Sequence, residues 1–427
     1  MSLLPLGAEI AEGRLTLGGV DALELAQRFG TPLWVYDEAT LRRQARAYLE
    51  GLGAYPGSSR AVFACKAQAT VSVLRVVIEE GLGADAASEG ELAAALRAGV
   101  EPGSLVIHGN NKSRADIETA LAVGAGLIVV DHAAELDLIE EPAAAAGRVQ
   151  PVLVRVTPDI VADTHHKIVT GHAASKFGLA PPDALDALDR AAALEHLDPQ
   201  GLHVHLGSQI DDLSTYLQAV DWLVEFIESN GLGDLPVLDV GGGLAVAHAD
   251  GDIEPDIADS VETIAQHLAE RLIAHGLPLP ELIVEPGRSI ADRAGVTLYT
   301  VGAIKHTAAG VVYAAVDGGM SDNPRPTLYG ARYEAFVADR ANVDGDRAYT
   351  IAGKHCESGD VLIESAWLPE LHPGDVLCIP VTGAYTASMA SNYNLLPRPA
   401  AVMVADGRAT PVLRRETMQD LLARDLG

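Results

Sequence analysis

Eight short apolar runs recur between residues 62 and 284, and each has the length and composition of a buried β-strand. Between them lie stretches with the three- and four-residue spacing of amphipathic helices. The strand-like runs are Val62–Cys65, Ala84–Ala87, Leu105–His108, Leu127–Val130, Val152–Val156, Leu202–Leu206, Val237–Val240 and Leu282–Val284. The helical stretches are Val71–Glu80, Glu89–Ala98, Ser113–Val123, Ala133–Ala146, Pro182–Ala193, Leu213–Ser229 and Ile257–His275. This alternation predicts an α/β fold with a parallel sheet. The number eight favours closure into a (β/α)8 TIM-like barrel over an open doubly wound sheet.

The pattern changes after about Ala291, where strand-like runs punctuated by Gly, Pro and Asp replace the helical spacing. These runs are Leu298–Ile304, Val311–Val316, Tyr349–Ala352, Val361–Ser365, Val376–Val381, Ala401–Val404 and Pro411–Leu413, and a closing helix is predicted at Thr417–Ala423. Two strand candidates near the start, Arg14–Leu17 and Leu33–Tyr36, are not needed for the barrel. The sequence therefore predicts a barrel domain over residues 37–291. Residues 1–36 and 292–427 are expected to form a β-sandwich or β-barrel domain.

The composition excludes several classes of protein. With 48% hydrophobic residues the chain can bury a core, so it is not mainly disordered. A formal charge of −29 argues against binding to nucleic acid or to an anionic membrane. No apolar run approaches the roughly 18 residues of a spanning helix, and the first residues do not resemble an export signal. Three cysteines without a C-x-x-C pair fit a reducing compartment, so we expect a cytoplasmic protein.

Unusual polar and glycine residues fall at the ends of six of the eight predicted barrel strands. In a barrel of this kind the catalytic groups lie at the carboxyl ends of the strands. The residues in question are Lys66, Asp85, Ser88, His108, Asn110, His205, Gly207, Ser208, Gln209, Gly241, Gly242, Gly243, Glu285, Pro286, Gly287 and Arg288. This clustering favours an enzyme over a structural or scaffolding protein.

Each of these features also has an ordinary structural interpretation. Lys66 could be a solvated surface residue, or a desolvated amine that forms a Schiff base with an aldehyde. Gly241–Gly243 could be a tight turn, or a nest of backbone N–H groups for a phosphate. Glu285 could belong to a structural ion pair, or point into the barrel mouth. His203 and His205 share a face of one strand, but no carboxylate or cysteine lies at a usual ligand spacing, so we expect no metal.

Taken together, the features point to one cofactor. Pyridoxal phosphate (PLP) needs an amine for its aldehyde, donors for its phosphate and a charged partner for its ring nitrogen. A lysine, a glycine nest, an aromatic ring and a carboxylate at one barrel mouth supply all of these.

The chain resembles the diaminopimelate decarboxylases, which share the alanine-racemase-like PLP fold, over essentially its whole length. In the barrel the resemblance rests on ACKA around Lys66, HGNNKS at His108–Ser113, SKFG at Ser175–Gly178, HVHLGSQ at His203–Gln209, DVGGGL at Asp239–Leu244 and EPGR at Glu285–Arg288. In the β module it rests on DGGMSDNPRPTLYGA at Asp317–Ala331, KHCESGD at Lys354–Asp360 and TGAY at Thr382–Tyr385. Glu89 stands where family members usually have a glycine.

The resemblance implies a role for each matched residue. Lys66 would bind the cofactor aldehyde, His205 would stack on the pyridine ring, and the Glu285 carboxylate would pair with the ring nitrogen. The implied catalytic residues are Lys66, Cys356, Glu285 and His205. The implied cofactor-binding residues are Lys66, Asp85, His205, Ser208, Gly242, Gly243, Glu285, Pro286, Gly287, Arg288 and Tyr385. The implied substrate-binding residues are Arg288, Arg325, Tyr329, Glu357 and Tyr385.

The implied reaction converts meso-2,6-diaminopimelate into L-lysine and CO2. Cys356 or Lys66 would donate the final proton. Cys356 and Glu357 would enter the active site from a neighbouring subunit, so the resemblance implies a homodimer. Arg325 and Glu357 are natural partners for the amino acid head at the far end of the substrate.

The sequence leaves related enzymes as alternatives. Ornithine, arginine and carboxynorspermidine decarboxylases share this architecture, but CESGD and the arginine in DNPRPTLYG favour a distal amino acid head over a distal amine. A racemase fits less well, because Glu285 is the ring partner that decarboxylation uses. A non-catalytic PLP-binding protein of this fold would lack the β module.

Overall fold

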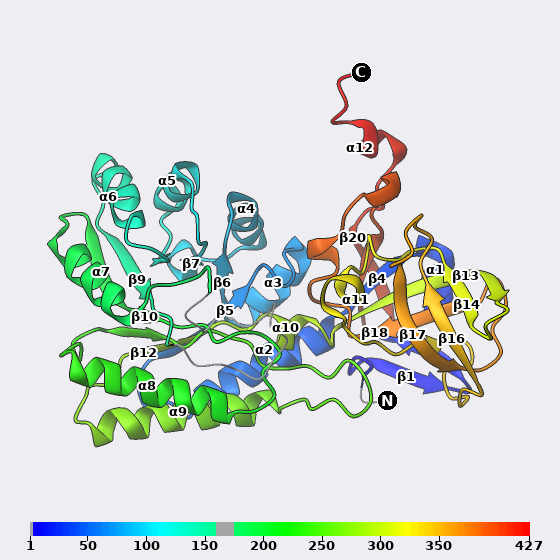
Figure 1. The fold of residues 1–427 in the computed structure, drawn as a ribbon, viewed down its shortest axis with the longest axis horizontal. Coiled ribbons are helices and arrows are strands. Elements are labelled where there is room, and N and C mark those ends of the chain that lie inside the picture. The colour runs from blue at the N-terminus through cyan, green and yellow to red at the C-terminus, as the bar shows by residue number, and fades with distance from the viewer. Residues whose placement is uncertain (1–2, 159–174) are drawn as a thin grey trace. The chain divides into compact units, whose positions relative to one another are not determined.

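The computed structural model describes residues 3–158 and 175–427, and it divides this chain into two compact units. The first unit comprises residues 1–43, 246–253 and 290–427, and the second comprises residues 44–245 and 254–289. Figure 1 shows the helices and strands of both. The domain limits expected from the sequence, 37–291 against the remainder, stay a prediction.

The second unit contains a closed barrel of eight parallel strands, as predicted. The strands are β5 (Ser59–Ala64), β6 (Gly83–Ala86), β7 (Leu105–Ile107), β8 (Leu127–Val130), β9 (Gln150–Arg155), β10 (Leu197–His203), β11 (Val237–Asp239) and β12 (Glu281–Val284). They follow one another around the barrel in chain order, and β12 closes the ring by pairing with β5. All eight carboxyl ends therefore lie at one mouth, which is where the predicted chemistry falls.

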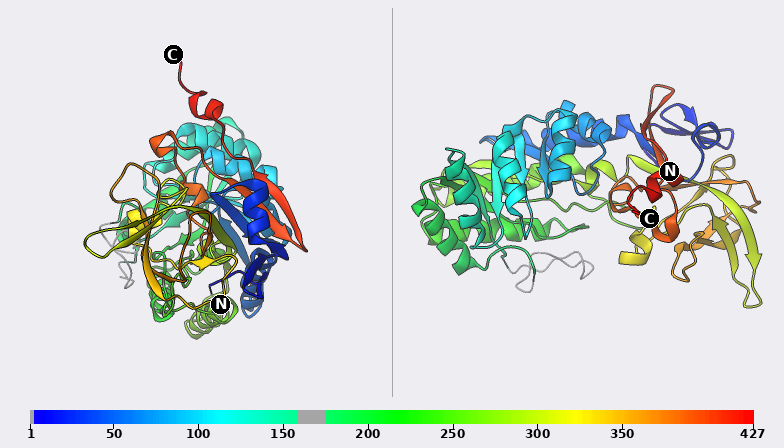
Figure 2. Two further views of the ribbon diagram at one scale, coloured as in Figure 1. Left: turned by 90° about the vertical axis from the view of Figure 1, so that its right-hand side faces the viewer. Right: turned by 90° about the horizontal axis from the view of Figure 1, so that it is seen from above.

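Helices alternate with these strands and cover the outside of the barrel (Figure 1, Figure 2). They are α2 (Glu38–Leu52), which begins in the first unit, then α3 (Val71–Glu79), α4 (Glu89–Ala98), α5 (Arg114–Val123), α6 (Glu135–Ala145), α7 (Pro181–Ala193), α8 (Ser214–Ser229) and α9 (Ile257–Ala274). The short helix α10 (Arg288–Ala291) follows β12 and ends in the first unit. The local sequence determines where several of these helices begin and end. Ser113 caps α5 in a capping box with Asp116, and Gly124 ends that helix in the left-handed conformation.

The barrel interior is filled by branched aliphatic side chains, such as Val62, Val106, Leu153 and Ile283. Small residues allow the strands to approach each other closely. A Cβ on Gly201 would lie 1.8 Å from the Val237 carbonyl oxygen, so a larger residue would push β10 and β11 apart. The strand ends that form the mouth therefore rest on a closely packed barrel interior.

The first unit is organised around a nine-stranded sheet in which β17, β16, β14, β13, β4, β19 and β20 are neighbours in that order, with β18 pairing with β13 and β15. The strands are β4 (Leu33–Asp37), β13 (Gly295–His306), β14 (Val312–Val316), β15 (Phe336–Val337), β16 (Arg347–Ala352), β17 (Val361–Leu368), β18 (Val376–Pro380), β19 (Ala400–Ala405) and β20 (Arg408–Leu413). Strand β4 lies antiparallel to β13 and parallel to β19. The prediction that Leu33–Tyr36 joins the β module is therefore confirmed.

The other early strand candidate, Arg14–Leu17, forms a strand of this unit but belongs to a small sheet of its own. That sheet contains β1 (Ala8–Ala11), β2 (Arg14–Leu17) and β3 (Val20–Asp21). Leu15 and Leu17 point into the same core cluster as Val296 and Val402, so packing joins the two sheets. The remaining helices are α1 (Ala22–Phe29), α11 (Arg325–Tyr329) and α12 (Met418–Leu422). Across the part of the chain that the structure describes, no helix is both long and apolar enough to cross a membrane.

Candidate active site

The carboxyl ends of the barrel strands gather most of the residues predicted from the sequence. Lys66 follows β5, Asp85 lies in β6, and Glu285 directly follows β12. His203 is the last residue of β10, and His205 comes two residues later. The Lys66 side chain is exposed, whereas Asp85 and Glu285 are buried. An accessible amine thus shares the mouth with buried carboxylates.

Two histidines hold the Glu285 carboxylate. His108 Nε2 lies 2.5 Å from Oε1, and His203 Nε2 lies 3.2 Å from Oε2. Burial alone would raise the pKa of Glu285, but the neighbouring histidines hold it well below the usual value. Because a carboxylate has about four acceptor positions, two of these bonds leave room for a further donor. Glu285 is therefore an ionised, oriented carboxylate.

The neighbouring carboxyl groups behave differently. Burial raises the pKa of Asp85, although His108, whose Nε2 lies 3.9 Å from Asp85 Oδ1, opposes this. Burial, and next the charge of Glu285, raise the pKa of Asp239 well above its usual value. Like charges in a low dielectric cannot all ionise, so the negative charge is concentrated on Glu285.

The two histidines of the HVHLGSQ motif have different partners, although the sequence places them on one face. Burial lowers the pKa of His203 to about 4, so it is neutral at pH 7. Burial and the charge of Lys66 also lower the pKa of His205 well below its usual value. The Gly242 N–H donates a hydrogen bond to His205 Nδ1, with 3.2 Å between the two nitrogens. This bond fixes the imidazole of His205 at the mouth.

The three glycines form a tightly fitted turn. Gly241 and Gly243 have φ angles of +70° and +122°, which favour glycine. A Cβ on Gly242 would lie 2.0 Å from the Glu285 carbonyl oxygen. The Gly241 N–H donates to Asp239 Oδ1 at 2.8 Å, so part of the predicted nest is used within the protein.

A cation and a hydroxyl lie together beyond this turn. Arg288 donates from Nε and Nη2 to the Ser208 Oγ, at 3.3 and 3.1 Å. The hydroxyl oxygen accepts these bonds, so its own proton can be donated to an anion. Arg288 is 9% exposed, and a buried guanidinium is well suited to bind a phosphate or carboxylate.

These residues fit PLP. Lys66 offers the amine, Ser208 and Arg288 offer anion-binding donors, and Glu285 offers an ionised carboxylate. Asp85 Oδ2 and His203 Nδ1 are buried and have no hydrogen-bond partner among the described residues. Both atoms are therefore available to form hydrogen bonds with a ligand.

Three ligand atoms, from His108, His203 and Glu285, also lie within 4.8 Å of one another. His108 and His203 already direct ring nitrogens at the carboxylate, so hydrogen bonding explains the cluster. The absence of a metal stays a prediction.

The sequence placed His108 at a strand end and His203 on a strand without giving either a catalytic or binding role, and it did not single out Arg155 or Asp239 for the site. Arg155 ends β9, is 8% exposed, and interacts with the charges of Asp131, Glu285, Asp85 and Asp239. A guanidinium within the apolar run Val152–Val156 was a usable signal for it. The partnership of His108 with Glu285 spans 177 residues and had no local signal.

The remaining predicted residues lie in the first unit. Arg325 is 5% exposed, and its Nη1 lies 3.3 Å from Asp292 Oδ2. Tyr329 ends α11, Cys356 and Glu357 are exposed, and Tyr385 has a φ of +56°. The Cys356 N–H donates to Asn394 Oδ1 at 2.8 Å, which fixes the backbone beside the thiol.

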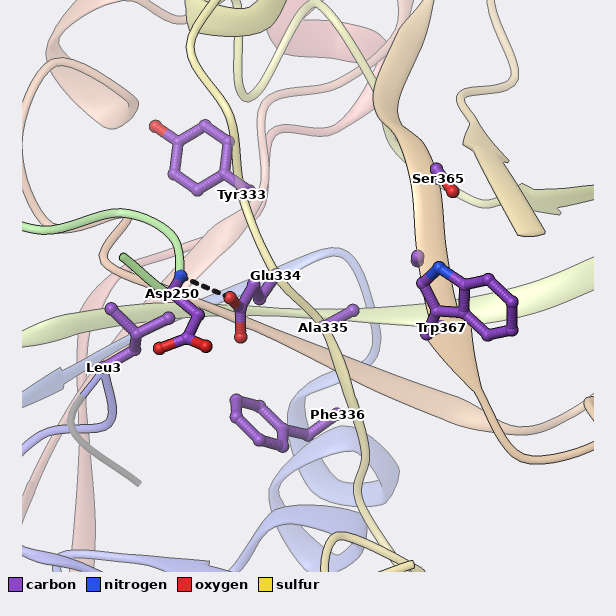
Figure 3. A pocket seen from close by; sticks show the side chains of 9 residues that line it. Leu3, Asp250, Tyr333, Glu334, Ala335, Phe336, Ser365 and Trp367 are labelled. Atoms are coloured by element: carbon purple, nitrogen blue, oxygen red, sulfur yellow. Dashed lines mark hydrogen bonds between the residues drawn. The ribbon is translucent and has the colours of Figure 1, made fainter. Parts of the chain in front are cut away.

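This unit also has a separate hollow of about 490 Å³ (Figure 3). Its lining includes Leu3, Tyr333, Phe336 and Trp367, and the Asp250 N–H donates to the Glu334 carboxylate at its rim. None of the predicted site residues lines it, so we do not assign it to the reaction.

Comparison with known proteins identifies the family. Residues 38–292 match the pyridoxal binding domain of the pyridoxal-dependent decarboxylases. A diaminopimelate decarboxylase of Actinosynnema pretiosum subsp. auranticum is 45% identical, with 99% of this chain and 95% of the relative covered. The Bacillus subtilis diaminopimelate decarboxylase is 41% identical, with coverage of 97% and 95%.

The fold comparison agrees. The crystal structure of diaminopimelate decarboxylase from M. jannaschii in complex with L-lysine superposes with a TM-score of 0.91 at 32% identity, covering 98% of each chain. Near-complete coverage means that both units are shared with this relative. The chain therefore belongs to the diaminopimelate decarboxylase family of PLP-dependent decarboxylases.

Proposed function

We propose that this chain removes one carboxyl group from meso-2,6-diaminopimelate and releases L-lysine, the last step of lysine biosynthesis. The observation that carries the proposal is the Glu285 carboxylate, which His108 and His203 keep ionised at a barrel mouth that also bears an exposed lysine. PLP, when bound, supplies an electron sink that accepts the electron pair left by departing CO2. The residues described below bind the cofactor, orient the substrate and return a proton to the product.

Different barrel residues are proposed to bind different parts of the cofactor. Lys66 would provide the amine for the aldehyde, and Glu285 would supply an ionised carboxylate for the ring nitrogen. His205 would contact the ring. The phosphate would be held by Ser208, Gly242, Gly243, Pro286, Gly287 and Arg288. Because burial favours the protonated form of Asp85, this group can donate a hydrogen bond without adding charge beside Glu285.

The substrate has an amino acid head at each end, and only one head reacts. Arg288, Tyr329 and Tyr385 serve the substrate near the cofactor, while Arg325 and Glu357 recognise the distal carboxylate and ammonium. Guanidinium groups suit carboxylates because they donate two parallel hydrogen bonds. Cys356 or Lys66 returns the proton after CO2 has left.

The assembly and location follow from the same proposal. We propose a homodimer in the cytoplasm, in which Cys356 and Glu357 of one subunit complete the active site of the other. A small amino acid substrate, and no nucleic acid or membrane, is the expected partner. The barrel domain extends over residues 37–291 in this proposal.

The test compares CO2 release from meso-diaminopimelate, ornithine and arginine by the PLP-loaded protein. We expect release from diaminopimelate alone, with an equal amount of lysine. Preference for ornithine or arginine would contradict the assignment of diaminopimelate as the substrate. It would support the alternative of an ornithine- or arginine-type decarboxylase.

A second measurement isolates Lys66. Lys66→Ala should abolish the visible absorption band that PLP acquires when it is bound to a lysine. Lys305→Ala, on β13, is the control and should keep the band. An unchanged band in Lys66→Ala would exclude the assigned role of Lys66.

A further inference from the structure

One fully buried carboxylate in the first unit, Asp292, connects two segments that carry proposed substrate-binding residues. Its Oδ2 accepts from Arg325 Nη1 at 3.3 Å, and its Oδ1 accepts from the Ala384 N–H at 3.2 Å. Its backbone oxygen also accepts from the Gly383 N–H at 2.9 Å. Asp292 thus holds both the guanidinium of Arg325 and the backbone that leads directly to Tyr385.

The guanidinium of Arg325 is only partly used by this contact. Nη1 is directed at Asp292, while the buried Nε has no hydrogen-bond partner among the residues that the structure describes. Nε and Nη2 form the edge of a guanidinium that binds a carboxylate through two parallel bonds. A buried donor left without a partner is costly, so this edge is suited to a ligand carboxylate.

A histidine also contacts Asp292, at the same carboxylate oxygen as Arg325. His248 Nε2 lies 3.0 Å from Asp292 Oδ2, and His248 Nδ1 lies 2.9 Å from the Val246 carbonyl oxygen. A carbonyl oxygen can only accept, so Nδ1 carries a proton. A second proton must then lie between Nε2 and the carboxylate, whichever atom holds it.

Arg325 is positively charged in this cluster, because a guanidinium is not deprotonated in proteins. Its Nε edge can therefore attract a carboxylate. The ring of Tyr333 packs edge-on against His248 at 5.4 Å and limits its movement; Tyr333 also lines the hollow in Figure 3.

We propose that Asp292, supported by His248, is a positioning residue for substrate specificity: it presents the Nε edge of Arg325 to the distal carboxylate of the substrate and fixes the segment before Tyr385. This inference rests on the proposed function, because it takes the substrate to have a distal carboxylate. It assigns roles to Asp292 and His248, neither of which the sequence pattern singled out.

The test measures binding rather than turnover. L-Lysine and cadaverine have the same chain and amines, but only lysine has the carboxylate. Isothermal titration of the PLP-loaded protein gives both Kd values, and their ratio reports recognition of the carboxylate. We expect Asp292→Ala to lower the preference for lysine about tenfold or more, since a charge-assisted hydrogen bond orients the guanidinium.

Two further variants separate orientation from general damage. Asp292→Asn keeps an oxygen acceptor for Arg325 and should retain most of the preference. His248→Leu removes the support alone, should lower the preference less than Asp292→Ala does, and decides the matter if Asp292→Ala does not fold. Asp221→Asn is the control, because it loosens a His–Asp pair on the barrel helices, His267 Nε2 to Asp221 Oδ1 at 2.8 Å, and should change neither Kd.

The outcomes distinguish the two proposals. A purely structural role would weaken the binding of lysine and cadaverine equally, and an unchanged ratio in a folded Asp292→Ala or His248→Leu protein would overturn the inference. Failure of the wild-type protein to decarboxylate diaminopimelate, while it still prefers lysine to cadaverine, would overturn the proposed function instead.

Discussion

The ionisation of Glu285 depends on two histidines that are distant in sequence. Burial of a carboxylate normally favours its protonated form, and here two imidazole nitrogens reverse that tendency. His203 does so as a neutral donor, because its own burial lowers its pKa to about 4. A neutral donor can orient the carboxylate without cancelling the charge that the cofactor ring requires.

The low pKa of His203 predicts a contribution to acid sensitivity. In the unfolded chain this pKa returns to about 6.5, so between pH 6.5 and pH 4 the unfolded state binds more protons. Stability therefore falls as the pH falls through this range, by up to about 1.4 kcal/mol per pH unit for this group. We expect His203→Gln to show a shallower pH dependence of the free energy of unfolding, measured in urea.

His267→Gln provides the matched control. His267 is partly exposed on α9, so this change serves as the comparison for removing a histidine outside the buried cluster. Equal slopes for wild type and His203→Gln would contradict the assignment of a depressed pKa.

The three cysteines differ in exposure, which allows a direct test of Cys356. Cys356 is exposed, while Cys65 and Cys378 are buried, and burial raises the pKa of both. Since the thiolate is the reactive form, a thiol reagent should label Cys356 first in the folded protein. Cys356→Ala should slow turnover at least tenfold while sparing the absorption band of the bound cofactor. Wild-type turnover in this variant would exclude an essential role for the thiol.

The hydrophobic pattern of the sequence predicted most of the barrel elements but not how distant segments pair. All eight barrel strands were predicted within a few residues, because each apolar run is short and flanked by glycine or polar residues. Helix α2 was not predicted, although its sequence, EATLRRQARAYLEGL, is amphipathic and therefore carried a usable signal. The position of β4 between β13 and β19 had no local signal, since its partners lie hundreds of residues later.

The same limit applied to the candidate site. Residues at strand ends, such as Lys66, Glu285 and Arg288, follow from the barrel geometry. Pairings such as Asp292 with His248 depend on side-chain direction, which hydrophobic pattern does not specify.

A buried ion pair joins the loop after β7 to the first residue of α6. Lys112 Nζ lies 3.1 and 2.9 Å from the two oxygens of Glu135, and it also donates to the Gly109 oxygen at 2.8 Å. Removing one partner leaves a buried charge, so we expect Lys112→Met to lower the free energy of unfolding by about 3–5 kcal/mol. Lys112→Met combined with Glu135→Gln should cost clearly less than the sum of the single changes.

An ion pair on the surface provides a comparison for the buried pair of Lys112 and Glu135. Arg114 on α5 is exposed and pairs with Glu118 at 2.7 Å and with Glu141 at 2.9 Å. Because solvent screens such pairs, Arg114→Met should lower the free energy of unfolding far less than Lys112→Met does. Additive costs for Lys112 and Glu135 would mean that the buried contact contributes little.

The protein carries a formal charge of −29, and this excess must be accommodated by its surface. Many of the described arginines pair with nearby carboxylates, as Arg398 does with Glu416, but acidic residues outnumber basic ones by 59 to 30. Their mutual repulsion favours expanded states.

Added salt should therefore stabilise the fold. Because the Debye length falls from about 30 Å at 0.01 M to about 8 Å at 0.15 M salt, repulsion between distant carboxylates is largely screened. We expect the thermal midpoint to rise with NaCl over this range, as measured by circular dichroism. A falling midpoint would show that local ion pairs outweigh the overall repulsion.

The pairing of β4 has a consequence for how the protein is made. Residues 33–37 leave the ribosome before any barrel strand, yet their partners are residues 295–298 and 400–404. At about 5–20 residues per second, β4 waits roughly 20–70 s for β19 to be synthesised. The barrel strands emerge during that delay, while an apolar strand with both edges unpaired remains open to incorrect partners. The earliest strand of the main sheet thus reaches its final place only when translation is nearly finished.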